Sequence, residues 1–104
     1  MSSSSEPAPS LNNRHRDTLL QLFEHPTSHN IEWQNVLSLL EAVGSVEQDH
    51  AGKFLVRLGA ETEVFLRPKG KDIDAQQVVD LRRMLAGAGY GALVGELGGE
   101  GKEV

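Results

Sequence analysis

The sequence contains no cysteine, and its 104 residues include one tryptophan and one tyrosine. Without cysteine the chain has no disulfide bond and no thiolate-based metal or redox site. No apolar run approaches the roughly 18 residues that a membrane-spanning helix needs, so we expect no membrane association. The N-terminus lacks the basic segment and the apolar stretch of a secretory signal, and we therefore expect a cytoplasmic protein.

An excess of positive charge is absent as well. Ten lysines and arginines stand against 15 aspartates and glutamates, which gives a net charge of −5 at pH 7. General nucleic-acid binders usually carry a basic balance or a basic patch. Between residues 31 and 90, however, six of the seven basic side chains lie from Arg57 onward. The sequence disfavours an unspecific phosphate-binding surface and leaves room for a local basic patch.

The two ends of the chain lack a regular apolar pattern. Serine and proline dominate the N-terminal end, and the C-terminal end is acidic and rich in glycine. Neither end offers enough apolar surface to offset the loss of chain entropy on folding. We therefore predict disordered tails at residues 1–13 and 91–104 around one domain at residues 14–90.

Two helices are predicted in the first half of that domain. The first covers residues 14–23 and ends before Pro26, because the residue before a proline disfavours the helical conformation. The second follows Asn30, a good N-cap residue, and ends at Gly44. Its apolar residues recur every three or four positions and share one face: Trp33, Val36, Leu37, Leu40 and Val43.

The middle of the chain changes to the two-residue period of β-strands. Residues 53–58 and 61–67 predict two strands joined by the two-residue turn Gly59-Ala60, which makes a hairpin. A weaker strand is predicted at residues 45–49.

A last helix is predicted after Asp74, which has Gln77 three residues further on in a capping-box pattern, and it ends near Gly87. The order is a short leading helix and then α-β-β-β-α. This order predicts an α+β fold, in which a three-stranded antiparallel sheet carries helices on one face.

Alternation along the strands predicts which side chains face away from the helices. The predicted outer set is Lys53, Leu55, Arg57, Glu61, Glu63, Phe65 and Arg67, and the predicted inner set of the third strand is Thr62, Val64 and Leu66. Two neighbouring apolar side chains on a charged face indicate a contact surface, so Leu55 and Phe65 form the candidate partner interface. A solvated face with ion pairs from Arg57 to Glu61 or Glu63 is the plainer interpretation.

Several residue strings lie along the chain: Phe23-Glu24-His25-Pro26, Ile31-Glu32-Trp33, VLSLLEAVG at 36–44, QQVVDLRRML at 76–85 and Ala88-Gly89-Tyr90. With the order of elements, they resemble the HicA family of toxin–antitoxin systems over roughly residues 19–90. The resemblance implies a fold similar to a double-stranded RNA-binding domain, a messenger-RNA-cleaving activity and a HicB partner that covers the active site.

The family's catalytic histidine stands at the start of the second strand, where this chain has Gly52-Lys53-Phe54. The resemblance therefore implies the fold and does not extend to the active site. His50 is the one histidine expected near the sheet, and it is the candidate general base of a relocated site because histidine is the side chain that most often serves in that role. His15, His25 and His29 are expected to be loop or capping residues. We expect no metal site and no cofactor.

Basic side chains near the hairpin are the candidate RNA-binding residues: Lys53, Arg57, Arg67, Lys69 and Lys71. Phe65 would supply a stacking platform for a base, whereas Glu61 and Glu63 would repel phosphates.

Three functions remain open. The first is a HicA-like domain without nuclease activity that binds a HicB-like antitoxin or structured RNA. The second is a toxin ribonuclease with a relocated base. The third is a stand-alone protein-interaction module, for which a homodimer is one arrangement.

Overall fold

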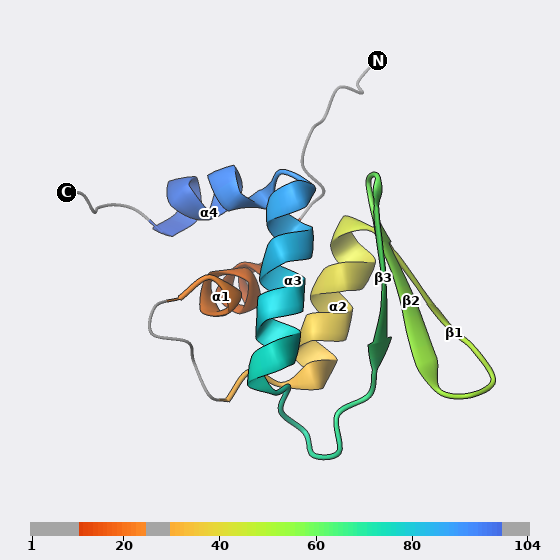
Figure 1. Ribbon diagram of the computed structural model, residues 1–104. Coiled ribbons are helices and arrows are strands. Elements are labelled where there is room, and N and C mark those ends of the chain that lie inside the picture. The colour runs from red at the N-terminus through yellow and green to blue at the C-terminus, as the bar shows by residue number, and fades with distance from the viewer. Residues whose placement is uncertain (1–10, 25–29, 99–104) are drawn as a thin grey trace.

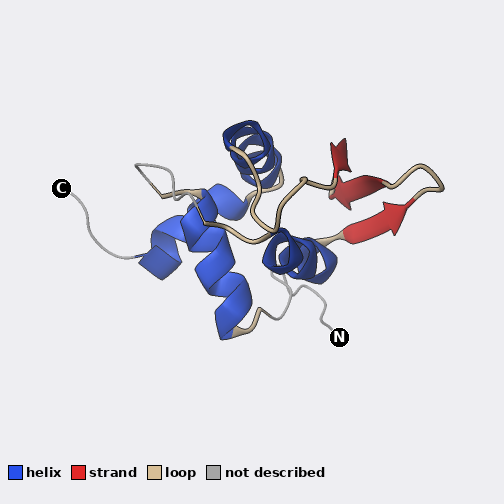
Figure 2. Ribbon diagram, turned by 90° about the horizontal axis from the view of Figure 1, so that it is seen from below, coloured by secondary structure: helices blue, strands red, loops and turns tan. Residues whose placement is uncertain are grey.

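The computed structural model describes residues 11–24 and 30–98. In chain order its elements are α1 (Asn13–Leu22), α2 (Trp33–Val43), β1 (Ser45–Gln48), β2 (Lys53–Leu58), β3 (Glu61–Leu66), α3 (Ala75–Gly87) and α4 (Tyr90–Gly98). The strands form one antiparallel sheet in the order β1-β2-β3, and the helices gather on one of its faces (Figure 1, Figure 2). The predicted α+β fold, a three-stranded antiparallel sheet with helices on one face, is confirmed.

One hydrophobic core joins the helices to the inner face of the sheet. Its buried side chains include Leu19 and Leu22 of α1, Val36, Leu39 and Leu40 of α2, Phe54, Val56 and Leu58 of β2, and Val78, Leu81 and Leu85 of α3. The spacing of three and four along each helix places these residues on one face, and burial of that face is the main force that holds the layers together.

Helix α1 begins at Asn13 because a capping box closes its first turn. The Asn12 side chain accepts a hydrogen bond from the backbone N–H of His15 at 2.8 Å, and His15 Nδ1 accepts from the backbone N–H of Asn12 at 3.4 Å. His15 also reaches α2, where its Nε2 lies 2.8 Å from Ser38 Oγ. Leu11 packs against the core. The predicted boundary of the N-terminal tail at residue 13 is therefore wrong, and residues 11–13 belong to the fold.

Helix α2 starts after Glu32 and not directly after Asn30 as predicted. A strand-like contact accounts for the difference. Glu32 forms an isolated antiparallel bridge with Asp72, the backbone N–H of Trp33 donates to the carbonyl oxygen of Lys71 at 2.8 Å, and that of Ile73 donates to Ile31 at 2.9 Å. This contact holds residues 31 and 32 outside the helix, so the helix begins two residues later than predicted, and its N-cap residue Glu32 makes no side-chain hydrogen bond.

The pairing of β2 with β3 decides which side chains reach the core. Leu58 lies opposite Glu61, and Phe54 lies opposite Phe65. Residues directly opposite one another in a sheet point to the same face, so Phe65 lies beside Phe54 in the core and is only 4% exposed. The prediction that Glu61, Glu63 and Phe65 face away from the helices is wrong.

The other set of β3 side chains faces solvent in their place. Thr62, Val64 and Leu66, predicted to face the helices, lie on the outer face of the sheet. The two-residue turn is the reason, because it sets the residue before the turn directly opposite the residue after it and so aligns Glu61 with the core-facing Leu58. The prediction for β2 holds, with Phe54, Val56 and Leu58 buried.

Helix α3 begins with the predicted capping box. Asp74 accepts from the backbone N–H of Gln77 at 2.8 Å, and the Gln77 side chain accepts from the backbone N–H of Asp74 at 3.2 Å. Gln77 Nε2 also donates to the carbonyl oxygen of Leu66 at 2.7 Å. The helix start is thereby tied to the end of β3.

Helix α4 occupies most of the segment that was predicted as the tail 91–104. Tyr90, Leu93 and Val94 follow the spacing of a helix face and pack, partly buried, against the core. That face offsets the entropic cost of the glycines around it, which is why composition alone misjudged the segment. Residues 1–10, which belong to the predicted N-terminal tail, lie outside the described residues, as do residues 99–104. No helix within residues 11–24 and 30–98 has the length and apolar character to cross a bilayer.

We expect Gly44→Ala to lower the free energy of unfolding by about 1–3 kcal/mol, the range typical of overpacking. A methyl group at this position would collide with the backbone carbonyl of Arg57 and the side chain of Leu58. Gly70→Ala is the matched control, because no heavy atom lies within 4 Å of its added methyl group, and we expect a change below about 1 kcal/mol. Urea denaturation measures both, and equal losses would contradict the close approach at Gly44.

Burial raises the pKa of Tyr90 above its ordinary value of 10.0. The folded state then disfavours the phenolate, so this contribution to stability is complete below pH 10 and is lost as the pH rises through the folded pKa. Tyr90 is the single tyrosine, so its near-ultraviolet absorbance gives a direct titration. We expect a higher midpoint in buffer than in concentrated urea. Equal midpoints would contradict the packing of α4 on the core.

Candidate functional site

The outer face of the sheet is the first candidate surface. The helices cover only the opposite face (Figure 1, Figure 2). Val64 and Leu66 are 56% and 61% exposed, and Leu55, directly opposite Val64, is half-buried. These three residues form what we call the apolar patch. An exposed cluster of this kind marks a contact surface more often than a single exposed residue does.

Charges of both signs surround the apolar patch. Lys53 lies opposite Leu66, and Glu47 lies opposite Leu55. A shallow depression of about 620 Å³ includes part of the patch and is lined by Glu47, Gln48, Asp49, Lys53, Leu55 and Val64. The expected ion pairs from Arg57 to Glu61 or Glu63 are absent, since Arg57 points to the outer face while both glutamates point to the inner one.

His50 lies exposed in the turn between β1 and β2. Asp49 organises this turn, because its side chain accepts hydrogen bonds from the backbone N–H groups of Ala51 at 2.8 Å and Lys53 at 2.9 Å. Among the described residues, His50 has no hydrogen bond or ion pair that would orient its ring. A general base needs such positioning beside the reacting group. His25 and His29 lie outside the described residues.

The five candidate RNA-binding residues do not share one surface. Lys53 and Arg57 lie on the outer face, and Lys69 is exposed on the loop after β3. Arg67 and Lys71 line a pocket on the helix side. Phe65, the expected stacking platform and partner contact, is in the core.

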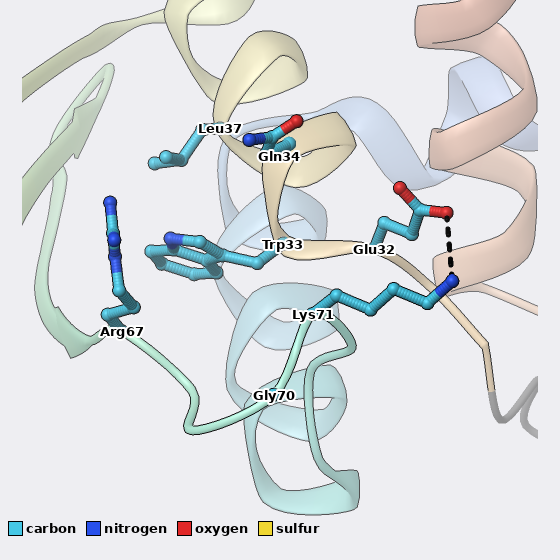
Figure 3. Close-up of a pocket in the computed structure, with 7 residues that line it drawn as sticks. All are labelled: Glu32, Trp33, Gln34, Leu37, Arg67, Gly70 and Lys71. Atoms are coloured by element: carbon cyan, nitrogen blue, oxygen red, sulfur yellow. Dashed lines mark ion pairs between the residues drawn. The ribbon is translucent and has the colours of Figure 1, made fainter.

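That pocket is the second candidate site, and we call it the Trp33 pocket (Figure 3). It has a volume of about 380 Å³ and lies between the start of α2 and the loop from β3 to α3. Glu32, Trp33, Gln34 and Leu37 line it from the helix, and Arg67, Gly70 and Lys71 line it from the loop. The backbone hydrogen bond from Trp33 to Lys71 holds the two walls together.

Trp33 forms the buried wall of the pocket and is 4% exposed. Its ring meets Phe54 edge to face, with ring centroids 5.3 Å apart and planes at 75°. The Arg67 guanidinium carbon lies 5.9 Å from the centroid of the Phe54 ring. Two aromatic rings and a cation therefore pack together at this end of the sheet, and both contacts are of favourable type.

The indole nitrogen of Trp33 is a buried donor without a partner. Nε1 and Asp72 Oδ1 are the two buried side-chain polar atoms in the described part of the chain that have no hydrogen bond. Figure 3 shows the indole nitrogen on the edge of the ring that faces Leu37 and the Arg67 guanidinium. An unpaired buried donor costs about 1–3 kcal/mol, so each case calls for a physical explanation.

The charges around the Trp33 pocket are unevenly paired. Lys71 Nζ lies 3.9 Å from a Glu32 carboxylate oxygen, and both side chains are exposed, which makes the pair weak. Arg67 forms no ion pair within residues 11–24 and 30–98.

The pocket was not predicted from the sequence, because Trp33 was assigned to core packing and Arg67 to the outer face. The sequence signal was the tryptophan itself, whose N–H needs an acceptor when the ring is buried.

Comparisons with protein-family models, with curated proteins and with solved structures found no match to this chain. The resemblance to the HicA family therefore rests on the residue strings and on the order of elements. Within the described ranges, no group of three or more His, Asp or Glu side chains lies close enough together to hold a metal ion.

Proposed function

We propose that this chain is a HicA-like binding domain that binds a protein partner through the outer face of its sheet and has no ribonuclease activity. The apolar patch is the main observation that supports this proposal. Val64 and Leu66 project from a face that none of the described helices covers (Figure 2). Full burial of such a side chain is worth about 1.5–3 kcal/mol, so a partner that covered the patch would gain substantially from it.

The surroundings of the patch favour a protein over RNA as the partner. Protein interfaces typically combine an apolar centre with a polar rim of mixed charge. Here Lys53 and Arg57 share the outer face with Glu47. RNA binding draws its affinity from clustered cations that meet phosphates, and the other basic candidates lie on the loop after β3 and in the Trp33 pocket.

The resemblance to HicA supports a HicB-like antitoxin as that protein. In the family the partner covers the start of the second strand, which corresponds to Lys53 in this chain. Lys53 projects from the outer face opposite Leu66, so a partner in that position would also cover the apolar patch.

The residues at the family's catalytic position support the proposed lack of nuclease activity. The exposed residue at that position is Lys53 and not a histidine, the side chain that most often serves as a general base. Phe54 points into the core. His50 lies in an exposed turn without an orienting partner among the residues described.

We expect Val64→Glu to weaken binding of the protein encoded by the adjacent reading frame, which is where an antitoxin is normally found. Size-exclusion chromatography of the co-expressed pair should show a complex for the wild type, and titration calorimetry should show at least about a tenfold loss of affinity for the variant. A carboxylate in place of an apolar contact leaves an uncompensated charge in the interface. Val79→Glu on α3 is the matched control, since Val79 is 43% exposed and lies away from the sheet.

The outcomes separate the alternatives. Equal loss of binding in Val64→Glu and Val79→Glu, or no complex with the wild type, would contradict the proposed partner surface. A concentration-dependent homodimer that Val64→Glu dissolves would assign the patch to self-association. Cleavage of messenger RNA by the purified chain, lost in His50→Ala, would establish the toxin ribonuclease instead.

A further inference from the structure

The Trp33 pocket has a chemistry of its own, separate from the outer face. Phe65 points into the core and Leu66 points outward, so Arg67, the next residue, returns to the helix side and lies over Phe54. The pocket and the apolar patch therefore lie on opposite sides of the sheet. A ligand in the pocket would not compete directly with a partner on the outer face.

We propose that the Trp33 pocket binds a small organic anion, whose carboxylate or phosphate oxygen accepts the indole N–H of Trp33 and pairs with Arg67. The buried indole N–H, which has no acceptor in the described chain, is the central observation. Buried donors in native proteins are almost always satisfied, and an indole N–H acts only as a donor. The missing partner must therefore be an acceptor.

The two cationic side chains of the pocket also favour a ligand that accepts hydrogen bonds. Arg67 is a donor without an ion pair in the described residues, and Lys71 is held only by a contact of 3.9 Å to Glu32. Figure 3 shows the Glu32 carboxylate turned toward Lys71 and away from the indole nitrogen. The Lys71 ammonium lies beside that carboxylate, so Arg67 is the cation of the pocket that faces the indole nitrogen (Figure 3).

Helix α2 adds to this preference for negative charge. The pocket lies at its N-terminus, the positive end of the helix dipole. The N-cap residue Glu32 makes no side-chain hydrogen bond to the first turn, and its carboxylate lies beside Lys71 instead. An oxyanion beside the indole N–H would gain from the same field.

The size and the apolar wall of the pocket indicate an organic body on the anion. Its volume of about 380 Å³ falls within the range of roughly 300–1,000 Å³ that is typical of small-molecule sites. Leu37 and the indole ring provide an apolar wall (Figure 3). A bare inorganic ion would leave this wall without a contact.

NMR titration of the full ¹⁵N-labelled chain tests the proposal, because the single tryptophan gives one indole N–H resonance. The probes are benzoate and phenyl phosphate, with inorganic phosphate and the neutral benzyl alcohol for comparison, at constant ionic strength. We expect benzoate or phenyl phosphate to shift the indole resonance saturably in the millimolar range or below. The probe that binds more tightly shows whether the pocket prefers a carboxylate or a phosphate. Benzyl alcohol should leave the indole resonance unshifted.

Two variants separate the pocket from general charge effects. Arg67→Gln should weaken binding at least about tenfold, whereas Arg83→Gln, an exposed arginine of α3, should leave it unchanged. Trp33→Phe keeps an aromatic ring and removes the donor, and the backbone resonance of Gln34 should then report weaker binding. No saturable shift with any anion, or equal affinity in Arg67→Gln and the wild type, would overturn the proposal.

Discussion

The two-residue turn between β2 and β3 is the constraint on which the functional surfaces depend. Gly59 adopts a positive φ of 58°, a conformation that only glycines adopt in the described chain, and this fits a hairpin turn with glycine at its first central position. The turn sets Leu58 opposite Glu61 and thereby sets every later pair along the two strands. One residue of slippage would exchange the two faces of β3.

Both candidate surfaces follow from that pairing. It buries Phe65 beside Phe54, and Phe54 in turn supports the Trp33 ring edge to face. It also brings Arg67 to the helix side, where the guanidinium lies over Phe54. The same alternation leaves Val64 and Leu66 on the uncovered face. The inner pocket and the outer apolar patch are two consequences of one strand register.

Local patterns predict most of this fold from the sequence. The capping box at Asp74 and the alternation in β2 are short-range signals, and both are found in the structure. The apolar stripe of α2 is found in part: Trp33, Val36 and Leu40 are buried, whereas Leu39 is buried in place of the partly buried Leu37 and Val43. Alternation alone misassigned β3, because apolar residues occupy both phases of the strand and only the hairpin pairing distinguishes them. Local sequence patterns could not predict the Trp33 pocket, because it joins residues 32–37 to residues 67–71 through a contact that exists only in the folded chain.

The facing of β3 is tested most directly by solvent paramagnetic relaxation, measured by NMR on side-chain protons with a soluble, uncharged gadolinium chelate. We predict strong relaxation of the Val64 and Leu66 methyl protons and little relaxation of the Phe65 ring, which is 4% exposed. Strong relaxation of the Phe65 ring together with protected Val64 methyl groups would contradict the register, and with it the outer patch.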